Sequence, residues 1–312
     1  MTKIKILYTI PNFDTAGSGK VLYDLAKYLD KDKFEVSIAC DSKKGSFYKE
    51  VEALELPIFI IQTTVPLRPY YSFLSRLQPL KQFIKENQFN IVHSWHWSSD
   101  WTEVLGAKLG GAKFVFTKKA MSWGNLHWKI RSFLSDFIVT INEEMKNYFP
   151  NKKAQKLIPI GIDLDYYNST HFPTNKDSNY FNIISVANLV PVKGIEVLID
   201  AVCTLDNPKI KLSILGDNNN EYGEKLQEKV NVLGKQEQIV FLGKHKDVRP
   251  FLVNSDLILF DKINKFFVQP KLKKSKNANS QCVIKSFCID KNALRKIFFA
   301  IHLDMKNKKM YF

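Results

Sequence analysis

Short apolar segments alternate with amphipathic stretches along most of this chain, and this alternation constrains its fold more than any other feature. Segments such as 3–10 (KIKILYTI) and 34–40 (FEVSIAC) are too short for buried helices and predict largely buried strands. Between them, apolar residues recur at helical spacing, as over 21–29. Strands that alternate with helices predict a parallel, doubly wound α/β sheet.

The first series of elements extends from residue 3 to about residue 161. A Gly-containing turn over 11–19 (PNFDTAGSG) is expected between the first strand and a helix that begins near Val21. The predicted strands are 3–10, 34–40, 57–62, 89–95, 113–117, 137–141 and 156–161, with further helices over 72–87 and 101–109. The polar stretch 168–180 then breaks the pattern and is predicted to be a linker.

A second series of the same kind follows the linker and stops at residue 260. Its predicted strands are 181–188, 211–217, 238–243 and 256–260, and its predicted helices are 194–206, 221–234 and 247–254. We therefore expect two Rossmann-like domains with doubly wound parallel sheets, 1–167 and 181–260, the second one incomplete.

The segment 261–312 differs in composition from the rest of the chain. It contributes +10 to the net charge of +15, is rich in Lys and Asn, and contains no Gly and no Glu. A native basic extension is one explanation. We expect instead that the reading frame is disrupted or the domain truncated after about residue 260, so that the DNA read in another frame would encode the rest. The lysines alone would give only salt-sensitive, non-specific affinity for nucleic acid, so no specific nucleic-acid partner is expected.

The cysteines and the apolar runs indicate a cellular location. Cys40, Cys203, Cys282 and Cys288 show no CxxC spacing and suit a reducing compartment. The N-terminal apolar run is too short for a signal peptide, and no run approaches the roughly 18 residues of a membrane span. We expect a cytoplasmic protein, with peripheral contact to the cytoplasmic face of a membrane left open.

Motifs in the second series carry a resemblance to a known family. The chain reads VANLVPVKG over 186–194, LGD over 215–217, VFLGK over 240–244 and NSDLILF over 254–260. This ordered set resembles the donor-binding domain of glycosyltransferase family 4, whose members are retaining enzymes with the GT-B fold. The resemblance covers roughly residues 3–260. It implies transfer of a sugar from a nucleotide-diphosphate sugar, a UDP- or GDP-sugar, to a glycan or lipid-linked acceptor, with no metal and no other cofactor.

Lys193 is the candidate catalytic residue and a donor-binding residue. A cation at the start of a helix near Gly194 would meet the donor diphosphate together with the amides of that helix. Fixed positive charge there would stabilise the leaving diphosphate in the transition state. The family usually places an Arg five residues earlier, where this chain has Asn188, which supplies a hydrogen-bond donor but no charge.

Two glycine-containing segments supply the remaining donor-side candidates. The resemblance implies that Gly17 and Gly19, after the first strand, approach the diphosphate. An ordinary strand–helix turn is the alternative explanation for them. Gly216 and Asp217 end a strand and are expected to border the nucleotide.

The tryptophans gather on the side that the resemblance assigns to the acceptor. All five lie within 95–128, near two predicted strand ends, where open α/β sheets bind ligands. His96, Trp97 and Lys118 are the candidate acceptor-side residues, although core packing is an equal alternative for any single Trp. Lys118 and Lys119 stand where some family members carry a histidine. His93 and His96 have no third ligand at fitting spacing, so no metal site is expected.

The acidic motif of the family is missing. After the strand at 256–260 the family continues with a Pro-Ser turn and a Glu-x7-Glu stretch that holds the sugar and the ribose. Here the chain reads DKINKFFVQPKLKKSKNANSQ, and its last glutamate is Glu237. We therefore expect impaired transfer. A catalytically inactive remnant or a non-enzymatic binding protein is the alternative.

Overall fold

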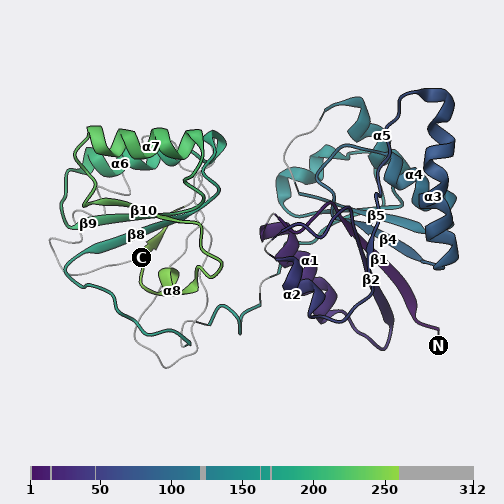
Figure 1. Ribbon diagram of the computed structural model, residues 1–312, viewed down its shortest axis with the longest axis horizontal. Helices are drawn as coiled ribbons and strands as arrows, with labels where there is room; N and C mark the ends of the chain where they lie inside the picture. Colours follow the sequence, from purple (N-terminus) through teal and green to yellow (C-terminus); the bar gives the residue numbers. More distant parts are fainter. Residues whose placement is uncertain are drawn as a thin grey trace. The chain divides into compact units, whose positions relative to one another are not determined.

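The computed structural model describes residues 2–14, 16–45, 47–119, 124–161, 163–168 and 171–259. The chain divides into two compact units, Met1–Leu164 and Asp165–Phe312. Each unit contains one parallel sheet with helices packed on it (Figure 1). The predicted fold class, two Rossmann-like α/β domains, is confirmed. The segment 261–312 lies outside the described residues, as does the explanation offered for its composition.

The first unit is built on a seven-stranded sheet in the order β3-β2-β1-β4-β5-β6-β7. Every neighbouring pair is parallel, with Ile6 of β1 opposite Val36 on one side and Ile91 on the other. The strands are β1 Ile4–Ile10, β2 Phe34–Cys40, β3 Ile58–Ile60, β4 Ile91–Ser94, β5 Lys113–Lys118, β6 Phe137–Thr140 and β7 Gln155–Leu157. The sheet is parallel and doubly wound, as the sequence predicts.

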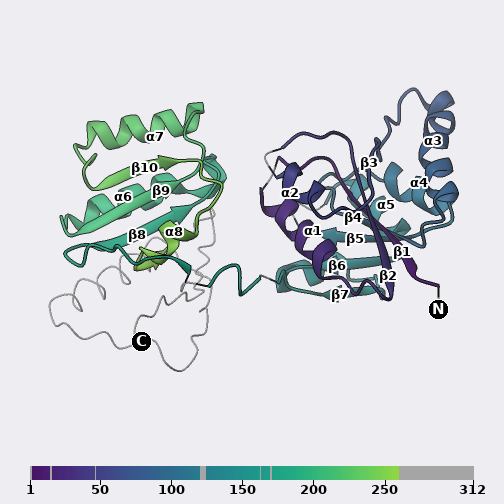
Figure 2. The ribbon, with the colours of Figure 1, turned by 60° about the horizontal axis from the view of Figure 1, so that its bottom comes forward.

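Helices cover the sheet from both sides (Figure 2). The apolar side chains of α1 and α2 pack with one face of β1 and β2, while α3, α4 and α5 pack on the opposite face. The helical segments are α1 Ala16–Tyr28, α2 Tyr48–Glu52, the 3₁₀ turn η1 Tyr70–Ser72, α3 Phe73–Glu86, α4 Thr102–Leu109, α5 Leu126–Leu134 and the 3₁₀ segment η2 Glu143–Tyr148.

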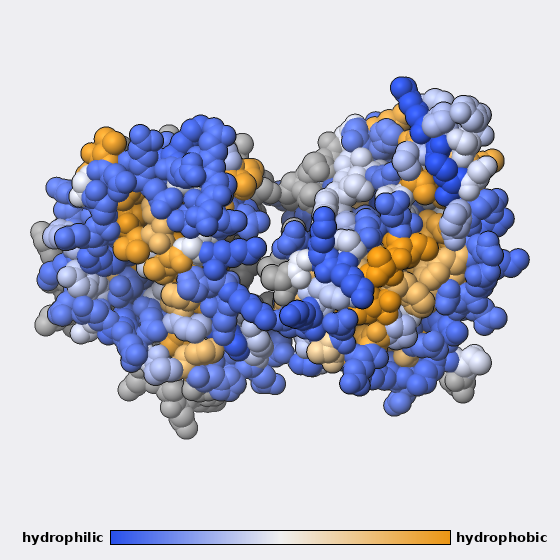
Figure 3. Space-filling view, viewed as in Figure 1, coloured by the Kyte–Doolittle hydropathy of each residue, from blue (hydrophilic) through white to orange (hydrophobic). Residues whose placement is uncertain are grey.

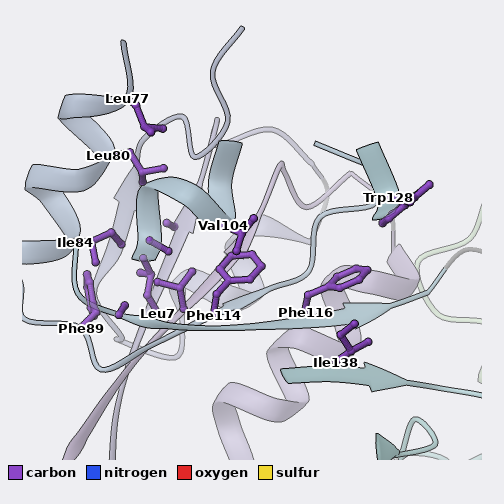
Figure 4. Close-up of a cluster of buried hydrophobic side chains, with 14 of the residues drawn as sticks. Leu7, Leu77, Leu80, Ile84, Phe89, Val104, Phe114, Phe116, Trp128 and Ile138 are labelled. Atoms are coloured by element: carbon purple, nitrogen blue, oxygen red, sulfur yellow. The ribbon is translucent and has the colours of Figure 1, made fainter. Parts of the chain in front are cut away.

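The core between the sheet and α3–α5 is rich in aromatic side chains (Figure 4). Phe114 and Phe116 of β5 are fully buried, and the ring of Phe116 stacks on that of Trp128 of α5 at 5.7 Å. Helices α3 and α4 approach closely at Gly106, where a Cβ would lie 2.5 Å from Cδ2 of Leu80. This core fixes the strand ends and the loops that follow them.

The second unit contains a four-stranded parallel sheet in the order β10-β9-β8-β11. Its strands are β8 Phe181–Val186, β9 Ile210–Leu215, β10 Ile239–Gly243 and β11 Leu257–Ile258. Its helical segments are the 3₁₀ turn η4 Pro191–Lys193, α6 Ile195–Leu205, α7 Glu221–Val232 and α8 Arg249–Val253. The apolar face of α6 is buried against β8 and β9, as its helical periodicity predicts.

The predicted turn over 11–19 was wrong, and the predicted strand 156–161 ends at Leu157. Helix α1 begins at Ala16, so Gly17 and Gly19 lie in its first turn and not in the predicted turn over 11–19. Glycine disfavours helices, but tertiary packing overrides that preference here. A Cβ on Gly19 would lie 3.1 Å from Cδ1 of Phe13 and 3.6 Å from Cδ1 of Phe47, so the glycine lets the helix start pack closely.

The segment predicted as a linker packs on the second unit where the structure describes it. The backbone N–H of Asn175 donates to Oδ1 of Asn254 at 2.8 Å, and Lys176 forms an ion pair with Asp256. These contacts tie the segment to α8 and β11.

Polar residues dominate the visible surface of both units (Figure 3). Apolar atoms gather on the first unit over the region where Figure 1 labels β1, β2 and β4. Within the described ranges, no helix is long and apolar enough to cross a bilayer.

Candidate functional site

The carboxyl ends of the parallel strands in each unit lie at one edge of its sheet, and the predicted site residues follow these ends. Ligands of open α/β sheets bind outside this edge. In the first unit, residues 95–100 follow β4 and Lys119 follows β5. In the second unit, residues 187–190 follow β8 and Gly216 follows β9.

The loop after β8 places Lys193 at the start of α6. Pro191–Lys193 form a 3₁₀ turn, and Gly194 then adopts the left-handed conformation at φ 62°, which favours glycine. The amide of Lys193 donates to the carbonyl of Val190 at 2.9 Å, which closes the turn. Among the described residues, no acceptor or carboxylate pairs with the half-buried Lys193 side chain. The cation and the positive end of the helix therefore lie together, an arrangement suited to an anion.

Gly216 brings the loops after β8 and β9 into contact. A Cβ at this position would lie 2.0 Å from the carbonyl oxygen of Ala187, so the site requires glycine. The amide of Gly216 donates to the carbonyl of Gly243 at 2.9 Å, which ties in the end of β10. Asp217 is exposed, and its Oδ1 accepts from the amide of Asn219 at 3.1 Å. Asn188 is also exposed, in the loop adjoining Gly216.

The first unit contains a buried ion pair that was not predicted from the sequence. Glu103 of α4 is 1% exposed and Arg131 of α5 is fully buried. Nη2 of Arg131 donates to Oε2 of Glu103 at 2.7 Å, and Ser94 at the end of β4 donates to the same oxygen at 2.6 Å. Thr9 at the end of β1 donates to Oε1. The pair therefore connects two strand ends with two helices.

Electrostatics keep Glu103 ionised. Burial alone would raise the pKa of Glu103. The interactions with His96, when that ring is protonated, and with the charge of Arg131, together with the hydrogen bonds from Ser94 and Thr9, outweigh burial and lower the pKa below its ordinary value. Arg131 also donates to the carbonyl of Asp100, in the loop that carries His96. The ion pair thus fixes the loop after β4.

His96 is part of this buried network. It is 3% exposed, and its Nε2 lies 2.9 Å from Oγ1 of Thr63 and 3.9 Å from Oε1 of Glu103. Burial lowers the pKa of His96, so the ring is neutral near pH 7. Asp41 at the end of β2 has a raised pKa, chiefly because of burial. The acceptor-side role of His96 stays a prediction, and from this position it would act through the loop.

Two lysines at the end of β5, Lys118 within the strand and Lys119 directly after it, have different surroundings. Lys118 is fully buried, with its Nζ 3.7 Å from the ring centre of Trp128. The Nζ of Lys119 instead donates to Oγ of Ser18 at 3.2 Å. Burial lowers the pKa of each lysine to about 8, and the charge of Arg131 contributes in both cases. Because Lys118 is buried, an acceptor could interact with it only through other residues. Lys119 lies beside the first turn of α1.

Tryptophans near this edge are divided between core and surface. Trp95 and Trp128 are buried, and Trp97 is 41% exposed. Trp123 lies outside the described residues. Trp97 therefore offers the accessible aromatic surface that the predicted acceptor side requires, while Trp95 and Trp128 follow the core-packing alternative.

A mainly apolar cavity of about 390 Å³ opens on the α1 side of the first sheet. His93 of β4 contributes to its wall, and Nε2 of His93 lies 2.8 Å from Oγ1 of Thr117. Burial lowers the pKa of His93 to about 4, with a smaller contribution from the charge of Lys119. Leu25 of α1 and Val139 of β6 supply apolar walls.

Metal-binding side chains do not cluster in the part of the chain that the structure describes. No group of three or more His, Cys, Asp or Glu residues there could hold an ion.

Comparisons with known proteins identify the family. The family model described as Glycosyltransferase Family 4 matches residues 15–166, and that described as Glycosyl transferases group 1 matches residues 167–267. No curated protein matches the chain.

Solved structures show the same fold at low sequence identity. A glycosyltransferase from Rickettsia africae ESF-5 has a TM-score of 0.73 and 19% identity, over 85% of this chain and 75% of that chain. HepE of Anabaena in complex with UDP and glucose has a TM-score of 0.66 and 17% identity, over 82% and 73%. The apo form of the lipopolysaccharide outer core galactosyltransferase WaaB has a TM-score of 0.59 and 15% identity, over 83% and 74%.

Two consecutive family models and the shared two-unit fold define the class of this protein. It is a glycosyltransferase with the GT-B fold. The chain belongs to glycosyltransferase family 4, as the motifs in its sequence predict.

Proposed function

We propose that this glycosyltransferase binds a nucleotide-diphosphate sugar, a UDP- or GDP-sugar, at the carboxyl edge of its second sheet. It transfers the sugar to a glycan or lipid-linked acceptor with retention of configuration and without a metal or other cofactor. HepE, of similar fold, is described in complex with UDP and glucose, which supports this donor class. A cytoplasmic location, with peripheral membrane contact where the acceptor is lipid-linked, is part of the same proposal.

The juxtaposition of Lys193 with the start of α6 and the glycine-lined end of β9 carries the proposal. The diphosphate is the leaving group, and its negative charge grows as the glycosidic bond breaks. Fixed charge from Lys193 and the amides at the start of α6 would stabilise that growth. Gly216 lets the loops after β8 and β9 meet at this edge of the sheet, and Asn188 offers a side-chain hydrogen bond.

Transfer by this chain is proposed to be impaired. Binding of the diphosphate requires only the loops described above, but orientation of the sugar and ribose in the family uses carboxylates after this sheet. The last glutamate of this chain is Glu237, which precedes β10. Orientation supplies a large part of enzymatic rate, so a donor bound without these carboxylates would react slowly. The alternative function, donor binding without transfer, rests on the same observation.

The variant Lys193→Ala tests the donor site. Loss of one charge-assisted contact should weaken binding of UDP and GDP by about 1.5–3 kcal/mol in calorimetric titration of the full chain. Lys209→Ala is a matched control, because Lys209 is exposed and immediately precedes β9, at the opposite edge of the sheet. Equal affinity of the wild type and Lys193→Ala for both nucleotides would refute the assignment.

A further inference from the structure

Lys119 is held at the carboxyl edge of the first sheet by two neutral oxygens. Its Nζ donates to the carbonyl of Trp95 and to the hydroxyl of Ser18. The ring centres of Trp95 and Trp97 lie 5.1 Å and 5.6 Å from the same nitrogen. An ammonium has three hydrogens to donate, and these two acceptors use two of them.

Lys119 lacks a counter-ion within the described ranges. No described carboxylate lies within 4.0 Å of its Nζ, and Glu103, which attracts it from farther away, is already paired with Arg131. Buried charges in proteins are normally paired. Burial lowers the pKa of Lys119 to about 8 as a consequence. The charge of Arg131 lowers the pKa of Lys119 further. His93 of β4 and His96 in the loop after β4 are themselves kept neutral by burial.

The first turn of α1 adds positive potential at the same place. Ser18 lies in this turn, which contains no acidic residue. The N-terminus of a helix carries a partial positive charge and attracts anions. Farther along α1, the carboxylate of Asp24 pairs with Lys20, and it forms no ion pair with Lys119. A cation held against the positive end of a helix is unfavourable unless an anion binds there.

Trp97 indicates what kind of molecule carries that anion. It is 41% exposed and lies beside Lys119, and exposed aromatic faces suit the stacking of sugar rings. We propose that Lys119, Ser18 and Trp97 form a subsite for an acidic sugar of the acceptor, with its carboxylate or phosphate on Lys119 and its ring on Trp97. This inference rests on the proposed glycosyltransferase function and specifies the class of its acceptor.

Competitive acetylation of the full chain tests the subsite. Acetic anhydride modifies neutral amines, so Lys119 should react with a midpoint near pH 8, which peptide mapping by mass spectrometry can resolve. Saturating glucuronate or glucose 6-phosphate should slow acetylation of Lys119 at least tenfold and raise its midpoint, because the bound anion stabilises the ammonium. Exposed Lys129 of α5 serves as the control and should react equally with and without the sugars.

The ligands and variants separate the outcomes. Glucose should give no protection, and a preference between glucuronate and glucose 6-phosphate would identify the anionic group. Protection by UDP and not by acidic sugars, or equal protection by glucose, would overturn the acceptor assignment, as would no protection by any ligand. Trp97→Ala should abolish protection by the acidic sugars while Lys119 still reacts, and unchanged protection would refute the stacking contact. UDP titration of the same preparations tests the donor site separately, because Lys119→Gln leaves Lys193 intact.

Discussion

The buried ion pair between Glu103 and Arg131 should control the stability of the first unit. Glu103→Leu removes the carboxylate and leaves a fully buried guanidinium that still donates to Ser94 and the carbonyl of Asp100. Loss of one member of a buried pair typically costs about 3–5 kcal/mol. The hydroxyl of Thr9 also loses its acceptor, which places the expected loss toward the upper part of that range.

The distribution of tryptophans provides an assay specific to this unit. All five tryptophans lie in the first unit, within residues 95–128, so their emission follows its unfolding and not that of the second unit. Urea unfolding of the full chain should therefore show a midpoint lowered by roughly 2 M for Glu103→Leu, with a slope of about 2 kcal/mol/M. Arg131→Met should cause a loss of similar size, because it leaves Glu103 as an unpaired buried anion.

A double-mutant cycle tests the physical reasoning. The variant with both substitutions carries no unpaired buried charge, so its loss of stability should fall short of the sum of the single losses by about 2 kcal/mol or more. Lys33→Gln removes an exposed ion pair with Asp30 in the same unit and should leave the midpoint unchanged. Additive losses, or a loss below about 1 kcal/mol for Glu103→Leu, would show that the pair does not stabilise the fold.

Two further predictions concern pH and backbone packing. Burial is the main reason that the pKa of His93 in the folded chain is lowered to about 4. In the unfolded chain the histidine has a pKa of about 6.5, so between these two values only the unfolded chain binds the proton. The stability of the first unit should fall as the pH drops through this window, and His93→Gln should flatten the fall in urea titrations between pH 7 and 4. Gly216→Ala places a Cβ 2.0 Å from the carbonyl oxygen of Ala187, a backbone atom that no rotamer change can move. It should destabilise the second unit by about 1–3 kcal/mol and speed hydrogen exchange in β8 and β9. Unchanged exchange in these two strands would contradict the predicted clash.

The central strands of both sheets could be predicted because they are largely buried on both faces. Segments such as Phe34–Cys40 and Phe181–Val186 must be apolar along most of their length, so each stands out in the sequence. Helix α6 was predicted with nearly correct bounds, because Gly194 precedes it and its apolar residues share one face. Helix α5 was missed, although Asn125 is a usable start signal whose side chain accepts from the amide of Trp128.

The interior of the candidate site could not be predicted in the same way. Glu103 and Arg131 are 28 positions apart in two different helices, and nothing in either local sequence marks them as partners. Only the packing of α4 beside α5 makes them contact. Lys118 and Lys119 are adjacent in sequence but have different surroundings. Lys118 is the last residue of β5 and lies over Trp128, whereas Lys119 follows the strand and donates to Ser18. The sequence prediction named Lys118 for the acceptor side, and that assignment stays a prediction, while the subsite that we propose uses Lys119.

The two units differ in how their polar groups at the sheet edge are used. In the first unit Glu103, Arg131 and Ser94 hydrogen-bond to one another, and Arg131 also holds the loop after β4 through the carbonyl of Asp100. Preorganised groups of this kind lose little freedom when a ligand binds, which favours orientation. Lys119 and Lys193 stand outside such networks, one in each unit, and neither has a carboxylate partner among the described residues. A donor diphosphate on Lys193 and an acidic acceptor on Lys119 would each supply the missing negative charge, so both substrates would bind by the same electrostatic principle.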